Sequence, residues 1–75
     1  MTQGRIDKTI DKMRRGGLPA PTRDRPAFES GNGRQCAGCH ETITQIERMA
    51  VVVLYGIALY RFHEDCYTAW ATFER

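Results

Sequence analysis

Two residue pairs with the same spacing, Cys36-Ala-Gly-Cys39 and His63-Glu-Asp-Cys66, constrain the fold of this chain more than any other feature. They contain every cysteine in the sequence. A pair separated by two residues, in a tight turn or in one turn of a helix, can bind a single ion without strain. Thiolate and imidazole are ligands that Zn2+ prefers. The two pairs therefore predict one structural Zn2+ held by Cys36, Cys39, His63 and Cys66.

The predicted zinc site is closed, which argues against catalysis by the metal. Four protein ligands complete a tetrahedron and leave no position for water or substrate. The rest of the chain has no Ser/His/Asp set and no free nucleophile, and its adjacent carboxylates Glu64 and Asp65 suit the positive end of a helix dipole. We therefore expect a protein that is not an enzyme.

A chain of this length needs an additional stabilising element, such as a bound metal. Its 75 residues form one domain at most, and such a chain buries little apolar surface against its conformational entropy. Three cysteines leave an odd thiol in any disulfide scheme, and Met1 is followed by polar or small residues instead of an apolar signal segment. The longest apolar run, residues 49–60, is too short to span a bilayer. We expect a reduced, cytoplasmic protein with no membrane segment.

Charge and composition divide the chain at residue 35. Residues 1–35 carry eight basic and four acidic side chains, hence +4, whereas residues 36–75 carry three basic and five acidic side chains, hence −2. The stretch 15–34 holds all the prolines and several glycines, which indicates a loop or linker. We predict a basic N-terminal arm over residues 1–35 and a zinc-binding module over residues 36–75.

Periodicity predicts the elements on either side of the linker. Ile6, Ile10 and Met13 share one helical face, so a short amphipathic helix is expected at about residues 5–15. Residues 47–54 and 57–62 are rich in Val, Ile, Leu and Tyr and flank Gly56, which predicts a β-hairpin. From His63 the pattern is helical, with one face predicted to contain Tyr67, Trp70, Ala71 and Glu74. A zinc knuckle, a β-hairpin and a C-terminal helix that completes the site form an α+β treble-clef zinc finger.

The motifs over about residues 36–70 resemble the first zinc half of a LIM domain. The resemblance is carried by Cys36-x-x-Cys39, Thr42-Ile43, the hairpin and Phe62-His63-x-x-Cys66-Tyr67. It implies metal roles for Cys36, Cys39, His63 and Cys66 and a packing role for Phe62. After Cys66 the chain departs from that family, because Ala69-Trp70 stands where a second zinc half would begin. In ground plan the chain is also similar to small bacterial LIM-like zinc proteins with a Leu-Pro arm.

Two other interpretations of the cysteines compete with zinc. Cys36-x-x-Cys39-His40 matches the attachment motif of a c-type haem, with Met49 or His63 as a second axial ligand, but this interpretation needs export and leaves Cys66 idle. A thioredoxin-like dithiol needs a βαβ context that this chain is too short to form. His40 itself is either an exposed knuckle residue or a ligand that exchanges with a neighbour.

The hairpin leaves an apolar face that something must cover. Residues 49–60 are apolar on both strand faces, whereas a two-stranded sheet on one helix needs only one such face. In one interpretation the arm folds back, so that Ile6, Ile10, Met13 and Leu18 cover Val51, Val53 and Leu59 or their neighbours. In the other, a partner protein or a second copy of the chain docks there. The second interpretation predicts protein interaction through the hairpin and helix surface.

The arginines of the arm support a different class of function. A flexible basic segment can follow a phosphate backbone, and this would make the chain a regulatory nucleic-acid-binding zinc finger. A solvated linker is the simpler explanation of the same residues, since the predicted C-terminal helix lacks a basic face. The residues concerned are Arg14, Arg15, Arg23, Arg25 and Arg34.

Overall fold

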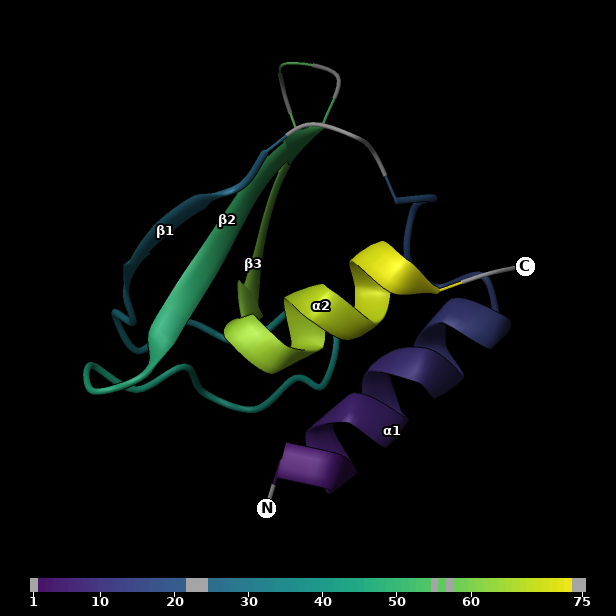
Figure 1. The fold of residues 1–75 in the computed structure, drawn as a ribbon, viewed down its shortest axis with the longest axis horizontal. Helices are drawn as coiled ribbons and strands as arrows, with labels where there is room; N and C mark the ends of the chain where they lie inside the picture. The colour runs from purple at the N-terminus through teal and green to yellow at the C-terminus, as the bar shows by residue number, and fades with distance from the viewer. Residues whose placement is uncertain (1, 22–24, 55, 57, 74–75) are drawn as a thin grey trace.

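The chain folds into a three-stranded antiparallel sheet and two helices in a computed structural model that describes residues 2–21, 25–54, 56 and 58–73. The central strand is β2, with β1 on one side and β3 on the other. Helix α2 lies between the sheet and α1 (Figure 1). The predicted α+β class is therefore confirmed. In chain order the elements are α1 (Thr2–Arg14), β1 (Ala27–Ser30), β2 (Arg48–Leu54), β3 (Ala58–His63) and α2 (Glu64–Thr72).

Helix α1 confirms the predicted N-terminal helix but is shifted toward the chain start. Its last residue is Arg14, and Gly16 in the turn that follows has a φ of +74°, in the left-handed region that glycine adopts without a steric penalty. The amide of Gly17 donates to the carbonyl of Lys12 at 2.9 Å, which satisfies a carbonyl of the last turn.

Strand β1 lies inside the segment that the composition predicted to be a loop or linker, so that prediction is wrong at residues 27–30. All four of its residues are exposed. The strand pairs with β2 through the backbone, with Phe28 opposite Ala50. A short edge strand of this kind needs no alternating apolar pattern, and its residues therefore carried little sequence signal.

The hairpin and the C-terminal helix are confirmed with small changes in their bounds. Strands β2 and β3 pair from Met49 opposite His63 to Leu54 opposite Ala58, and Gly56 in the turn has a φ of +75°. Residue Ile57 of the predicted second strand and Glu74 of the predicted helix face lie outside the described residues.

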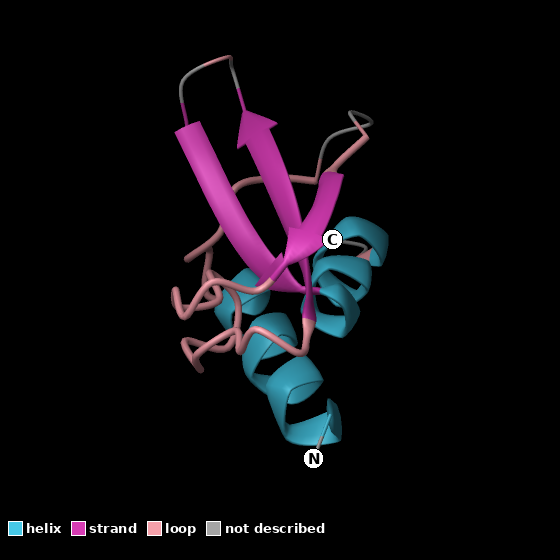
Figure 2. Ribbon diagram, turned by 90° about the vertical axis from the view of Figure 1, so that its left-hand side faces the viewer, coloured by secondary structure: helices cyan, strands magenta, loops and turns pink. Residues whose placement is uncertain are grey.

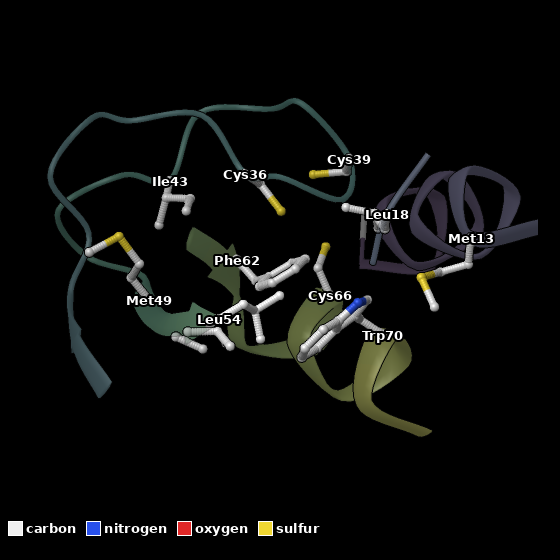
Figure 3. Close-up of a cluster of buried hydrophobic side chains, with 12 residues drawn as sticks. Met13, Leu18, Cys36, Cys39, Ile43, Met49, Leu54, Phe62, Cys66 and Trp70 are labelled. Atoms are coloured by element: carbon white, nitrogen blue, oxygen red, sulfur yellow. The ribbon is translucent and has the colours of Figure 1, made fainter. Parts of the chain in front are cut away.

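The core lies between the sheet and α2. The ring of Trp70 in α2 stacks on Phe62 of β3, with ring centroids 5.2 Å apart, and the indole nitrogen donates to the carbonyl of Pro19 at 2.9 Å. Met13 and Leu18 are buried in the same cluster as the cysteines (Figure 3). Residues from both sides of position 35 therefore share one core, while the predicted division into two segments stays a prediction.

The arm does not cover Val53 and Leu59, so the first form of the expectation that it folds back over the strands is wrong, but Met13 and Leu18 are buried in one cluster with the neighbours on the other strand face, Ala50, Val52 and Leu54. Within the described residues, the backbone of helix α1 lies against α2 and not against the strands. Val53 and Leu59, directly opposite each other on β2 and β3, stay 49% and 46% exposed. The apolar face of α1 packs against α2, which has apolar surface on the side facing the sheet and on the side facing α1.

No helix within the described part of the chain is both long and apolar enough to cross a membrane.

Candidate metal centre

The first two candidate ligands lie in a tight loop, residues 35–42, which we call the knuckle. Gln35 and Thr42 form an isolated antiparallel bridge, and inside it the amide of Cys36 donates to the carbonyl of Glu41 at 2.9 Å. His40 completes the turn with a φ of +66°. The knuckle therefore holds the side chains of Cys36 and Cys39 on its inner side, where both are buried.

The other two candidate ligands lie where β3 meets α2. His63 is the last residue of β3 and the residue immediately before α2, and Cys66 lies in the first turn of that helix. Both side chains are buried. Figure 2 shows the loops gathered at the end of the sheet from which α2 begins. Sheet pairing brings the end of β3 to the knuckle, since the amide of Ala37 donates to the carbonyl of Arg61 at 2.7 Å.

The structure brings the four predicted ligands together in one buried group. Their ligand atoms all lie within 4.8 Å of one another. The Nδ1 atom of His63 is 3.3 Å from Sγ of Cys39 and 3.8 Å from Sγ of Cys66. A tetrahedron with metal–sulfur bonds of about 2.3 Å has ligand atoms about 3.8 Å apart. The three sulfurs point toward a common point (Figure 3), so the group can hold one metal ion.

The ring of His63 is oriented by a second hydrogen bond. Its Nε2 atom is 3.2 Å from the carbonyl oxygen of Thr42, which can only accept. Nε2 therefore carries the hydrogen, and the lone pair of Nδ1 faces the sulfurs. Metal-binding histidines commonly donate their other ring nitrogen to a carbonyl in this way.

The protonation of the three thiols fits a cation site. The hydrogen bond from Cys66 lowers the pKa of Cys36 to about 4, aided by its backbone neighbours. The same hydrogen bond, with burial, raises the pKa of Cys66, and burial raises the pKa of Cys39. A divalent cation at this position would make it favourable for all three thiols to lose their protons.

The remaining candidates from the sequence lie outside this group. His40 is exposed, and its Nε2 atom is 3.0 Å from Nζ of Lys12. The haem interpretation leaves Cys66 unused, yet Cys66 is buried among the other sulfurs. The arginines Arg14, Arg15, Arg25 and Arg34 are exposed, Arg15 is paired with Asp11, and Arg23 lies outside the described residues.

Sequence reasoning missed the polar residues of α1 that lie next to the buried group of candidate ligands. Thr9 is completely buried, and Arg5 pairs with both Glu47 and Asp65. Glu47 lies near His63, with Oε1 3.7 Å from Nε2 of the ring. The only available signal was the spacing of Arg5, Thr9 and Lys12, which places them on one helical face.

Comparison with known proteins found no matching family model, no matching curated protein and no matching solved structure.

Proposed function

We propose that Cys36, Cys39, His63 and Cys66 bind one structural Zn2+, and that the knuckle, hairpin and α2 form a LIM-like treble clef. The chemistry of the buried donor set supports zinc, because three sulfurs and one imidazole complete its preferred tetrahedron. A reduced cytoplasm would keep the thiols available for the metal. A closed site of this kind contributes folding free energy and leaves no coordination position for a substrate. We therefore propose that the protein is not an enzyme.

The proposed activity is binding to another protein through the exposed face of the hairpin. This open face comprises Ala27, Val51, Val53, Leu59 and Arg61. The observation that carries the proposal is the exposure of about half of Val53 and Leu59, which are adjacent on neighbouring strands. At the other end of the same face Met49 and His63 are buried. An apolar patch that the chain leaves uncovered is typical of an interaction site.

A photoreactive amino acid at position 59 tests this proposal in the cells that make the protein. We expect crosslinking to one protein, and to this chain itself if the partner is a second copy. Ile46 is the matched control, since it is also apolar and is 97% exposed but lies in the loop before β2. An excess of the unlabelled original chain should compete with the labelled chain and reduce crosslinking to that partner. The same excess of unlabelled chain carrying Leu59→Lys should not reduce it. Equal crosslinking from positions 46 and 59, or none from position 59, would contradict the proposal.

Nucleic-acid binding is the alternative, and the exposure of Arg14, Arg25 and Arg34 favours it. Fluorescence anisotropy with a labelled duplex and a labelled single strand separates the two functions. If the arginines bind phosphates, affinity falls steeply as salt concentration rises. Salt-sensitive binding that persists in Leu59→Lys and disappears when the three arginines become glutamine would favour this alternative.

A further inference from the structure

Helix α1 has a polar face in addition to its apolar one, and both faces contact the rest of the chain. Ile6 and Ile10 line a groove with Ala69 of α2 and with Phe73, the residue that follows α2. On an adjacent side of the helix, Arg5, Thr9 and Lys12 are spaced so that they follow one another along successive turns. All three contact the segments that carry the metal ligands, as the following contacts show.

Thr9 lies directly over the knuckle glycine. It is 0% exposed, and a Cβ atom built on Gly38 would lie only 2.4 Å from Oγ1 of Thr9 and 2.9 Å from its Cγ2. Gly38 has no positive φ, unlike Gly16, Gly33 and Gly56. The φ angle at position 38 therefore does not itself call for glycine, and the glycine is needed because the side chain of Thr9 occupies the space of a Cβ.

Lys12 binds the knuckle through its ammonium group. Its Nζ atom donates to the carbonyl oxygen of Ala37 at 2.8 Å and lies 3.0 Å from Nε2 of His40. Three thiolates and one Zn2+ together carry a net charge of −1, so a cation held against the knuckle offsets the charge of the loaded site.

Arg5 connects α1 to the segments on the histidine side of the site. One of its terminal nitrogens pairs with Glu47 and the other with Asp65 at 2.9 Å. Oδ1 of Asp65 accepts from the amide of Cys66 at 2.9 Å, and Glu47 lies beside His63. Arg5 thereby holds both carboxylates next to metal-binding residues.

From these contacts we infer that α1 is the outer wall of the metal centre, and that retention of zinc depends on the fit of Thr9 over Gly38. The inference rests on the proposed zinc site and concerns a role in positioning and shielding the ligands. Outer-shell partners commonly change metal affinity by about 10–100-fold, because they orient the ligands and limit solvent access. In this chain those partners come from the N-terminal segment, outside the predicted module.

A double-mutant cycle on the full chain tests the fit. The variants are Gly38→Ala, Thr9→Ala and the two combined, and each is first assayed for zinc content. Gly4→Ala is the matched control, since a Cβ at Gly4 meets nothing within 4 Å. The measurement is the rate of zinc transfer to excess chromogenic chelator. The absorption of thiolate-to-cobalt charge transfer in Co2+-loaded protein reports the ligand set independently.

Gly38→Ala should release zinc about tenfold faster, because the added methyl group displaces α1. Thr9→Ala removes the two closest atoms, so it should slow zinc release in the Gly38→Ala background while speeding it a few-fold in the original chain. Such a reversal of sign is the coupling expected of two positions that compete for the same space. Unchanged release from Gly38→Ala, or Thr9→Ala effects of the same sign in both backgrounds, would overturn the inference.

Lys12→Met provides a test that does not depend on a steric clash. It should release zinc several-fold faster than the original chain with an unchanged circular dichroism spectrum. A Lys12→Met chain that retains zinc as long as the original would also count against the role of α1. Failure of the original chain to bind zinc at all would instead reject the proposed site, so the two failures are distinguishable.

Discussion

The carbonyl oxygen of Thr42 lies 3.2 Å from Nε2 of His63 and so turns Nδ1 of that ring toward the sulfurs of Cys39 and Cys66. The knuckle therefore supplies two of the candidate ligands and also sets the orientation of a third. This relation explains how a histidine at the end of a strand can complete a site with cysteines that precede it by a whole hairpin.

The ring orientation predicts one tautomer of His63 in the zinc-loaded protein. We expect NMR correlation of the ring nitrogens to show hydrogen on Nε2 and a metal-bound Nδ1. The exposed ring of His40 serves as the internal control and should show the shifts of an unbound imidazole. A metal-bound Nε2 at His63 would contradict the site geometry.

Cys66→Ser should abolish zinc binding and the folding of residues 36–75. Cys66 is 0% exposed, and its sulfur is one of only four donors in the buried group. Loss of a structural zinc ligand removes the metal's contribution to folding. Zinc content and circular dichroism measure the outcome. His40→Asn is the control, because asparagine tolerates a positive φ and His40 lies outside the group, so this variant should retain one zinc.

Trp70→Ala should lower the free energy of unfolding by about 3–5 kcal/mol, the usual cost of removing a buried tryptophan. Trp70 is 1% exposed, stacks on Phe62 and donates to Pro19. Trp70→Phe keeps the stacking but leaves the carbonyl of Pro19 without its donor, so we expect a smaller loss of about 1–3 kcal/mol. Urea unfolding followed by circular dichroism measures both. Equal losses from Trp70→Ala and Trp70→Phe would contradict separate contributions from the stacked ring and from the hydrogen bond of the indole nitrogen.

Glu47→Gln should destabilise the protein by about 1–3 kcal/mol, the scale of a charge-assisted hydrogen bond. The bond from Arg5 lowers the pKa of Glu47 to about 2. A lowered pKa means that the stabilisation is complete above the unfolded value of about 4.3 and is lost as the pH falls toward 2.

The loss caused by Glu47→Gln should therefore be constant between about pH 6 and pH 8, where Glu47 is charged in both the folded and unfolded states. Urea unfolding at several pH values measures it. Glu64→Gln is the matched control, since Glu64 pairs with Arg48 at 3.5 Å and both side chains are more than half exposed. Its effect should stay below about 1 kcal/mol. Equal effects of the two substitutions would argue that Arg5 does not hold Glu47.

The sequence was most informative where chemistry restricts the residue type. The buried group of Cys36, Cys39, His63 and Cys66 could be predicted because few residue types suit a zinc site and their spacing suits a turn and a helix start. The hairpin was identifiable from its β-branched residues and Gly56. Strand β1 was not, because Phe28 and its neighbours pair through backbone groups that every residue possesses.

The role of α1 was the least predictable part of the fold. The spacing of Ile6, Ile10 and Met13 predicts an apolar face but cannot specify whether a sheet or a helix covers it. Thr9 carries no signal of burial, since threonine is most often exposed. Only the three-dimensional arrangement brings Thr9 to Gly38, because the two positions belong to segments separated by the whole linker.

Native mass spectrometry of the full chain, purified without added metal and compared before and after a strong chelator, tests the central claim most directly. We expect one zinc ion per chain, a narrow charge-state distribution of a folded protein, and conversion to an unfolded distribution when the chelator removes the metal. A metal-free chain that keeps the folded distribution in the presence of the chelator would contradict the proposed zinc-stabilised architecture.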